Sequence, residues 1–554
     1  MTEQITFQPT PLNADQSGQF FYINQFGGMN TISPRFAIGD GKFSYLENLL
    51  PLSSVAVNPV STEEQYASAL TVVPPQGANL PALPVVQVVD RMWHLAVGPG
   101  AGVSPTNWLI VHTQQGNLYA YDIDKTPVAN PVKINGSVLF GLPDMVVWQG
   151  TQLLVVDRGA GYYSFTCTGA SNALTWSAGV SLSAPASNLS LIAIAFGRVC
   201  VLANTQTYIF SAPGSYTDFT VLNGGISVVI TSEALRKSVT KMQLCGDYLY
   251  FIGDGAVFVA YNMQASGAHQ LSEVERTHGT QFYGAVENVE GTLVIATSDN
   301  LYSIQGSAPT VLMPAMSTFW AQQLDLLSQQ LVVTVATIRG AQVSLVLAKY
   351  VDPASGPRSI FLALCHGNAL ILSQATNIVY TCTVEMVEPD DGRSMFVTYA
   401  TDGTNIYPCF RDDPDTVNYS GTPGVTFKAV TKLYDMNQPA FFKQFVKGGA
   451  VGYCTSPFGT LTLQMDTEAK SSSTSLFSLP GLTFTNSSGA VITFTNTTLQ
   501  AINFVVSGIV MMRYTADLQG RYVGFTLSGT TPGFSLAALA VEFQPGASWL
   551  GGGA

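Results

Sequence analysis

Charged residues are scarce in this chain. Asp, Glu, Lys and Arg make up 10% of its 554 residues, whereas an ordinary soluble domain carries about 25%. The 35 acidic residues outnumber the 23 basic ones, which gives a formal net charge of −12. This disfavours a basic nucleic-acid reader, whose phosphate contacts need clustered Lys and Arg. Hydrophobic residues still make up 47% of the chain, and that share excludes disorder, which combines low hydrophobicity with high net charge.

Targeting and membrane signals are also lacking. The first 19 residues, MTEQITFQPTPLNADQSGQ, have no basic start and no apolar core, so we expect no secretory signal. The longest apolar stretches, such as Ile502–Met512, contain polar residues. They fall short of the roughly 18 residues that a membrane-spanning helix needs.

Cysteine pairs are missing as well. The seven cysteines are scattered, odd in number, and form no CxxC pair or cluster with histidine. This pattern predicts buried, reduced thiols.

Enzyme signatures are absent from the sequence: it has no HExxH, Walker loop, GxSxG elbow or GxGxxG. His269 and His278 share a polar loop in which Glu273 or Glu275 would be the third ligand of a metal site; the alternative is a solvated loop. The other three histidines are isolated, namely His94, His112 and His366.

Four aspartates occupy comparable positions in a repeat described below, namely Asp122, Asp157, Asp254 and Asp299. They are the candidate carboxylates of a propeller glycosidase, but acidic residues at such positions are also ordinary turn formers. The sialidase pattern SxDxGxTW is absent. We therefore expect no enzymatic activity, no catalytic residue, no cofactor and no metal ion.

Short strands dominate what is present. Runs rich in Val, Ile, Leu, Tyr and Phe recur between Gly, Asn, Asp and Pro. They predict strands at Trp108–His112, Thr151–Asp157, Arg198–Ala203, Tyr248–Ile252, Thr292–Ala296 and Gln330–Val335. The best helical window is Gln322–Gln330.

These strands repeat as a unit of apolar strand, tight turn and aromatic strand. Its aligned aromatic residues lie 44–50 residues apart, at Tyr119, Tyr163, Tyr208, Phe258 and Tyr302. Further units lie near Leu347 and Tyr407. Such a period with four short strands per unit is typical of a β-propeller. The aromatic residues predict packing between blades or, alternatively, a sugar-stacking surface.

The sequence therefore predicts an all-β protein with a divergent propeller of six to eight blades and a C-terminal β-sandwich. Beyond a polar, Pro/Gly-bearing linker the repeat is lost, while strands continue. The predicted parts are an N-terminal arm (1–40), the propeller (41–411), the linker (412–424), the sandwich (425–549) and a flexible tail (550–554). Two Gly/Pro-rich loops, Pro74–Pro84 and Val97–Pro105, are candidates for a gate or for plain blade connections.

Three segments carry a resemblance to a known family: Phe26–Pro51 (FGGMNTISPRFAIGDGKFSYLENLLP), Thr431–Tyr453 (TKLYDMNQPAFFKQFVKGGAVGY) and Arg521–Pro545 (RYVGFTLSGTTPGFSLAALAVEFQP). In their order and spacing they resemble the opening, the start of the C-terminal β domain and the closing strands of tail nozzle or tail-hub proteins. These belong to short-tailed double-stranded-DNA phages and are sometimes described as DNA-stabilisation proteins.

The resemblance implies a structural virion protein, assembled in the host cytoplasm and located in the phage tail. It implies a homohexameric ring below the portal and adaptor that docks fibres, a spike or a needle. Genomic DNA would be retained and then pass through the channel without sequence-specific binding, and host envelope contact would be indirect. An acidic or neutral wall suits sliding DNA, because it does not grip phosphates. The alternative is a receptor-binding or glycan-binding, possibly glycan-cleaving, propeller protein of the tail.

Overall fold

The computed structural model describes residues 18–53, 56–59, 80–84, 87–410 and 426–548, with short gaps inside the last two ranges. The predicted linker 412–424 and tail 550–554 lie outside them. The chain is all-β, as the sequence predicts, with 60% strand and 4% helix. It divides into two compact units, Ser61–Gly421 and the combination of Met1–Val60 with Thr422–Ala554.

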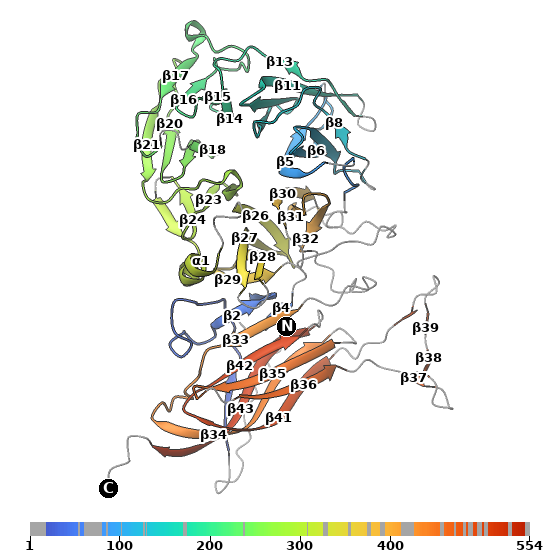
Figure 1. Cartoon of the computed structure of the whole chain (residues 1–554), viewed down its shortest axis with the longest axis vertical. Coiled ribbons are helices and arrows are strands. Elements are labelled where there is room, and N and C mark those ends of the chain that lie inside the picture. The colour runs from blue at the N-terminus through green and yellow to red at the C-terminus, as the bar shows by residue number, and fades with distance from the viewer. Residues whose placement is uncertain are drawn as a thin grey trace. The chain divides into compact units, whose positions relative to one another are not determined.

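Within its described residues, the Ser61–Gly421 unit contains seven antiparallel sheets that follow one another along the chain (Figure 1). The first three are β5 (Val89–Val97), β6 (Thr106–Thr113), β7 (Leu118–Asp122) and β8 (Val132–Lys133); β9 (Asp144–Trp148), β10 (Gln152–Asp157), β11 (Gly161–Thr168), β12 (Thr175–Trp176) and β13 (Val180–Ser181); and β14 (Leu189–Ala195), β15 (Arg198–Ala203), β16 (Thr207–Phe210) and β17 (Ile226–Val229).

The other four continue the series. They are β18 (Val239–Cys245), β19 (Tyr248–Gly253), β20 (Val257–Tyr261) and β21 (Gln270–Glu275); β22 (Val286–Val289), β23 (Thr292–Ala296), β24 (Leu301–Gln305) and β25 (Ala308–Val311); β26 (Val332–Ile338), β27 (Ala341–Asp352), β28 (Gly356–Cys365) and β29 (Asn368–Ser373); and β30 (Tyr380–Val387), β31 (Ser394–Thr401) and β32 (Ile406–Cys409). Strands lie at all six segments that the sequence predicts.

The first strands of these sheets pack in cyclic order. β5 lies against β9, β9 against β14, and so on through β18, β22, β26 and β30, and β30 lies against β5 again. Each first strand is the end strand of its sheet. The sheets stack face to face through buried side chains: one core cluster runs from Trp93 on β5 through Leu153 and Cys200 to Phe251 on β19. This stacking buries both faces of each sheet, which one small sheet cannot do alone.

The only α-helix in the described residues starts before the predicted window. α1 spans Ser317–Gln323, so the prediction of Gln322–Gln330 shares two residues with it, and residues 325–330 are not described. A short 3₁₀ turn, η3 (Pro314–Met316), leads into it, and proline suits such a first turn because it needs no N–H there. Trp320 fixes the helix by donating a hydrogen bond from Nε1 to the carbonyl of Thr297 at 3.1 Å.

The other unit consists mainly of two antiparallel sheets. One contains β3 (Leu49–Ser53), β4 (Ala56–Pro59), β43 (Phe534–Ser548), β34 (Phe441–Cys454) and β41 (Gly508–Gly520), with β1 (Gln19–Ile23) also paired to β43. The other contains β2 (Phe43–Glu47), β33 (Phe427–Thr431), β42 (Val523–Gly529), β35 (Gly459–Thr467) and β36 (Ser472–Leu479). Two short hairpins complete it: β37 (Phe484–Thr485) with β38 (Val491–Ile492), and β39 (Phe494–Thr495) with β40 (Ala501–Ile502).

These two sheets pack on each other through aromatic side chains. The rings of Phe427 and Phe534 stack at 6.2 Å, and the hydroxyl of Tyr514 on β41 donates to the carbonyl of Ser473 on β36 at 3.0 Å. The N-terminal strands belong to this unit: β1 pairs with β43 and β2 with β33. The sequence analysis grouped β2, β3 and β4 with the repeats, whereas they belong to this unit, in which β2 pairs with β33 and β4 with β43.

Candidate functional site

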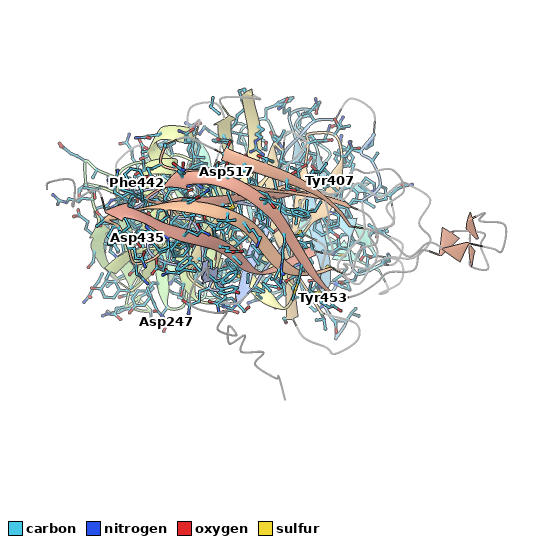
Figure 2. All side chains as sticks on the ribbon, turned by 90° about the horizontal axis from the view of Figure 1, so that it is seen from below. Asp247, Tyr407, Asp435, Phe442, Tyr453 and Asp517 are labelled. Atoms are coloured by element: carbon cyan, nitrogen blue, oxygen red, sulfur yellow. The ribbon has the colours of Figure 1, made fainter. Side chains whose placement is uncertain are left out.

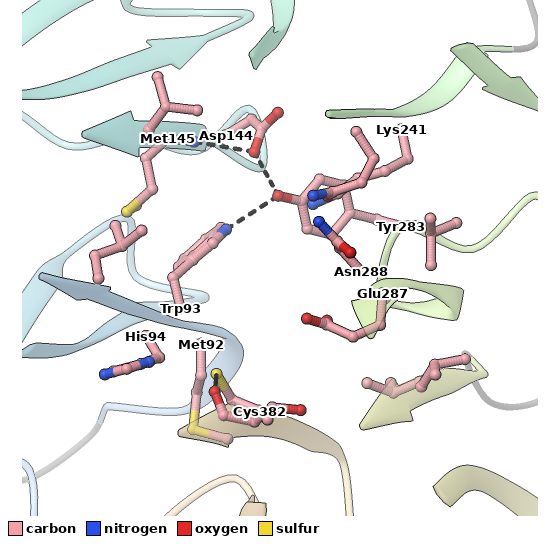
Figure 3. Close-up of a pocket in the computed structure, with 18 of the residues that line it drawn as sticks. Met92, Trp93, His94, Asp144, Met145, Lys241, Tyr283, Glu287, Asn288 and Cys382 are labelled. Carbon is pink, nitrogen blue, oxygen red and sulfur yellow. Dashed lines mark hydrogen bonds between the residues drawn. The ribbon is translucent and has the colours of Figure 1, made fainter. Parts of the chain in front are cut away.

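A cavity of about 470 Å³ lies between the first strands of the seven sheets. We call it the central cavity; Figure 3 shows part of it. Because each first strand is the end strand of its sheet, its outer backbone edge faces the cavity. The lining also carries acidic and basic side chains, namely Asp144, Lys241, Glu287, Glu290 and Glu385.

A buried hydrogen-bonded chain crosses one side of this cavity. The Trp93 Nε1–H donates to the hydroxyl oxygen of Tyr283 at 3.0 Å, and the Tyr283 hydroxyl donates to Asp144 Oδ1. Asp144 also accepts from the backbone N–H groups of Met145 and Ile192, each at 3.0 Å. The carboxylate therefore ties together β5, β9, β14 and the turn before β22.

Two cations contact the Tyr283 ring. The Lys241 Nζ lies 3.7 Å and the Arg91 Cζ 4.1 Å from the ring centre, distances at which a cation is attracted to an aromatic face. Arg91 also donates to the carbonyls of Leu142 and Pro143, both at 3.3 Å. Burial lowers the pKa of Lys241, and the nearby charges of Asp144 and Glu287 partly oppose that shift.

Burial favours the neutral forms of Glu287 and its neighbours. Burial raises the pKa of Glu287 to about 7, against a smaller opposing effect of Lys241. Burial also raises the pKa of the Cys382 thiol and lowers that of His94. The central cavity therefore contains a buried lysine whose pKa is lowered and a buried carboxyl group whose pKa is raised to about 7.

The raised pKa of Glu287 predicts that the stability of the folded protein depends on pH. The folded protein keeps a proton on Glu287 up to about pH 7, whereas an unfolded chain loses it near pH 4.3. The free energy of unfolding should therefore fall by about 2–3 kcal/mol between pH 5 and pH 8. Urea titrations across this range measure the fall. Glu287→Gln should remove it, while Glu290→Gln, an exposed neighbour, should keep it; an unchanged fall in the Glu287→Gln protein would contradict the assignment.

The four aspartates singled out from the sequence do not line the central cavity. Asp157 accepts hydrogen bonds from the backbone N–H groups of Gly141, Gly159 and Ala160 at 2.8–2.9 Å. Asp299 accepts from the Tyr302 hydroxyl at 2.7 Å within the β23–β24 turn. The remaining two are Asp122, which ends β7 and pairs with Lys125, and Asp254, in the β19–β20 turn. At these places the four aspartates act as turn residues, which is the second of the two interpretations that the sequence left open.

The five histidines are also separate. His112 is buried between Asp90, at 2.6 Å, and the carbonyl of Leu139, at 2.7 Å. His269 bonds to the Tyr208 hydroxyl at 2.8 Å. The His278 ring lies 4.4 Å from the Tyr302 ring at a tilt of 37°, and its Nδ1 is 3.4 Å from Glu275 Oε1. The other two are His94, which lines the central cavity, and His366, in an exposed turn. Across the described residues no three His, Cys, Asp or Glu side chains gather as a metal site.

The repeat's aromatic residues serve the core. Tyr119, Tyr208, Phe258 and Tyr302 are buried, which supports packing rather than a sugar-stacking surface. Six cysteines of the described part are free and buried, as expected: Cys167, Cys200, Cys245, Cys365, Cys382 and Cys409.

Each of the two candidate gating loops forms a backbone hydrogen bond to a distant segment in its described part. The Leu80 N–H donates to the carbonyl of Ile406 at 3.1 Å, and the Gly98 N–H to that of Gly150 at 2.8 Å. Neither residue lines the central cavity.

Sequence motifs did not identify the charged residues of the central cavity as a candidate site. Lys241 and Glu287 stand in first strands that match no known motif. Only their position, one strand before the apolar strand of each repeat, could have singled them out.

Comparisons with known proteins assign no family. No protein-family model and no curated protein matches the chain. Among solved structures, one match is the crystal structure of the computationally designed Ika8 protein, with 10% identity and a TM-score of 0.31, covering 60% of this chain and 98% of that one. No helix in the described residues is long and apolar enough to cross a membrane.

Proposed function

We propose that this chain is a structural tail protein of a double-stranded-DNA phage. In this proposal the Ser61–Gly421 unit is a seven-bladed β-propeller and the other unit a β-sandwich, and copies assemble as a homohexameric ring below the portal and adaptor. The ring retains packaged DNA, conducts it during ejection, and docks fibres, a spike or a needle.

The observation that carries the proposal is that the three segments resembling phage tail nozzle proteins meet in one unit. Phe43 on β2, in the first segment, pairs with Thr431 on β33, which opens the second. β33 pairs in turn with β42 of the third segment, Val430 opposite Thr526. The repeat region separates the first segment from the other two in sequence, so their convergence supports a shared structural origin for the resemblance.

Polar side chains of these segments join one another. The Arg35 Nε–H donates to the carbonyl of Thr431 at 2.8 Å. The buried ammonium of Lys443 donates to the carbonyls of Gln438 and Arg521 at 2.6 and 2.9 Å. The second segment resembles the family through a pattern Asp-x-x-x-Pro…Lys…Phe, which Asp435, Pro439, Lys443 and Phe445 match here. The contacts of Lys443 give that pattern a structural reason.

An exposed apolar face supports assembly into a ring. Strand register places Phe20 beside Glu542 and Tyr22 beside Ala540, and it places Met511 opposite Val451, on the sheet β1–β43–β34–β41. Figure 2 shows Phe442 and Tyr453 on this sheet. Phe20, Tyr22, Phe442, Tyr453 and Met511 are each 45–50% exposed. Exposed apolar side chains gathered on one face are typical of protein interfaces.

The central cavity is too small to conduct DNA. A volume of about 470 Å³ corresponds to roughly 15 water molecules. In this proposal duplex DNA therefore passes through the opening between copies of the chain. A net charge of −12 suits a wall that does not bind phosphates.

The stoichiometry in virions tests the proposal. We expect quantitative mass spectrometry of purified particles to give this protein at about half the copy number of the portal protein. Absence from the particle would refute the structural role. A multiple of three well above that number would favour a fibre or spike instead.

The exposed face gives a matched variant pair for the same experiment. Met511→Asp places a charge in the proposed interface and should reduce incorporation into particles at least tenfold. Val180→Asp, at an exposed apolar position in the other unit, is the control and should assemble normally.

A further inference from the structure

A short loop between β8 and β9, residues 136–142, presents three large apolar side chains to solvent. We call it the apolar loop. Val138, Phe140 and Leu142 are 47%, 67% and 45% exposed, and Phe140 is more exposed than any other aromatic side chain of the described residues. Leu139, between them, is buried in a core cluster. The alternation therefore directs every second side chain of the loop outwards.

Hydrogen bonds hold the backbone of the apolar loop in this position. The Leu139 carbonyl lies 2.7 Å from the Nε2 of buried His112, and the Gly141 N–H donates to Asp157 Oδ2 at 2.8 Å. The fold therefore fixes these apolar side chains at the surface, although their burial would be favourable.

The end of the apolar loop has a strained backbone. Leu142 has a φ of 59°, in the left-handed region that bulky residues disfavour. Arg91 holds this conformation by donating to the Leu142 carbonyl at 3.3 Å. Strained residues of this kind cluster at binding surfaces and persist only where the surrounding structure holds them. An exposed, strained leucine therefore points to a binding role for the loop.

Two exposed cations flank the apolar loop. Lys133 is exposed at the end of β8, just before the loop, and the exposed Arg158 has its backbone against the loop. The nearby carboxylates are covered: Asp157 is 1% exposed and Asp90 18%. An apolar tip with exposed cations beside it is complementary to a bilayer surface that contains anionic lipids.

The chemistry of the tip favours a bilayer over a protein partner. Ser137 is the one exposed polar side chain within the apolar loop. A protein interface adds directional hydrogen bonds to its apolar contacts, about one per 100–200 Å², whereas a bilayer surface requires none. The boundary between headgroups and acyl chains accepts aromatic and aliphatic side chains next to cations.

A second exposed apolar pair lacks this charge pattern. Val221 and Leu222, in the 3₁₀ turn η1 (Val221–Asn223), are 79% and 95% exposed. Asp218 lies beside them, and hydrogen bonds from Thr220 lower the pKa of its carboxyl group. The ionised carboxylate is repelled by anionic headgroups, so this turn serves as the internal control for the apolar loop.

We propose that the apolar loop inserts into the surface of a lipid bilayer that contains anionic lipids. The side chains of Val138, Phe140 and Leu142 enter the boundary between headgroups and acyl chains. The side chains of Lys133 and Arg158 contact the lipid phosphates. This surface is separate from the proposed ring interface and does not depend on it.

Cosedimentation of the full-length protein with lipid vesicles tests the proposal. The vesicles contain phosphatidylcholine with about 30% phosphatidylglycerol, and pure phosphatidylcholine vesicles are the matched probe. We expect the wild type to bind the anionic vesicles and to bind the neutral ones about tenfold more weakly. Phe140→Ser should lower binding to the anionic vesicles about tenfold, because it removes the largest apolar side chain of the tip.

Two further variants control this result. Leu222→Ser removes a more exposed apolar side chain and should leave vesicle binding unchanged. Phe140→Trp should keep binding, because tryptophan suits the bilayer interface; retained binding shows that position 140 acts through its aromatic side chain. No binding of the wild type, equal binding to both kinds of vesicle, or equal binding by Phe140→Ser and the wild type would each overturn the proposal.

Sedimentation velocity without vesicles separates a bilayer from a second copy of the chain as the occupant. We expect the wild type and Phe140→Ser to show the same self-association. If Phe140→Ser weakens self-association and leaves vesicle binding intact, the apolar loop is a contact between copies and the proposal is wrong.

Discussion

Replacing Arg198 by methionine is expected to lower the free energy of unfolding of the Ser61–Gly421 unit by about 3–4 kcal/mol. The guanidinium is 1% exposed and donates to the carbonyls of Ser211 and Gly224 at 2.8 and 2.6 Å. It also donates to those of Gln264 and Ala265 at 3.2 and 2.7 Å. Methionine fills similar space but leaves four carbonyls without this donor. The loss is partly offset because a buried cation without a carboxylate partner is itself costly.

Urea unfolding of the full chain, followed by hydrogen exchange of the unit's amides, measures this change. Arg158→Met is the matched control: Arg158 is exposed in the β10–β11 turn, and the change should cost less than about 0.5 kcal/mol. The free energy of unfolding of the Arg198→Lys protein should lie between those of the other two variants. A lysine ammonium group donates to fewer carbonyls than the planar guanidinium group of arginine. Equal stability of the Arg198→Met and Arg158→Met proteins would show that the carbonyls find other donors.

The same arginine orders an exposed loop. Gly224 follows η1 (Val221–Asn223), whose Val221 and Leu222 are 79% and 95% exposed. Asp218 supports the turn by accepting from the Thr220 N–H at 2.9 Å. We therefore expect faster amide exchange around Gly224 in the Arg198→Met protein even under conditions where the rest of the unit stays folded.

The repeat could be predicted from sequence because its signal is local. Tyr119, Tyr163, Tyr208, Phe258 and Tyr302 all lie on the third strand of their sheets, and apolar runs bounded by turn residues mark the strand before each. Alternation and turn chemistry act over a few residues, so a single sequence reveals them.

The non-local features of the fold could not be predicted from local sequence patterns. The pairing of β2 with β33 joins residues nearly 400 positions apart, and neither strand carries a mark of its partner. α1 starts at Ser317, before the predicted window, because burial of Phe319 and Trp320 and the proline turn before them set its start. The central cavity exists only when seven first strands converge, and their separate sequences give no sign of it.

The second large effect is expected at Asp144. Asp144→Asn should lower the free energy of unfolding of the Ser61–Gly421 unit by about 3–5 kcal/mol. The carboxylate is 2% exposed and accepts from the Tyr283 hydroxyl and from the N–H groups of Met145 and Ile192. An amide has one acceptor oxygen and an NH₂ group, so the NH₂ must face one of these donors. The substitution also removes the anion that faces Arg91 and Lys241. Asp254→Asn, in an exposed turn, is the control and should be nearly neutral.

Asp144→Asn has two destabilising effects, the loss of hydrogen bonds and the loss of the anion that faces Arg91 and Lys241. A double-mutant cycle with Tyr283→Phe separates them. Tyr283→Phe removes the hydroxyl that joins Trp93 to Asp144 but keeps the ring that both cations contact. If the hydrogen-bonded chain acts as one network, the double variant should be about 1–2 kcal/mol more stable than the sum of the single changes predicts. Additive effects would instead assign the cost of Asp144→Asn to the unbalanced charges of Arg91 and Lys241. In that case Asp144→Asn combined with Lys241→Met should recover part of the lost stability, because removing the second cation restores the charge balance.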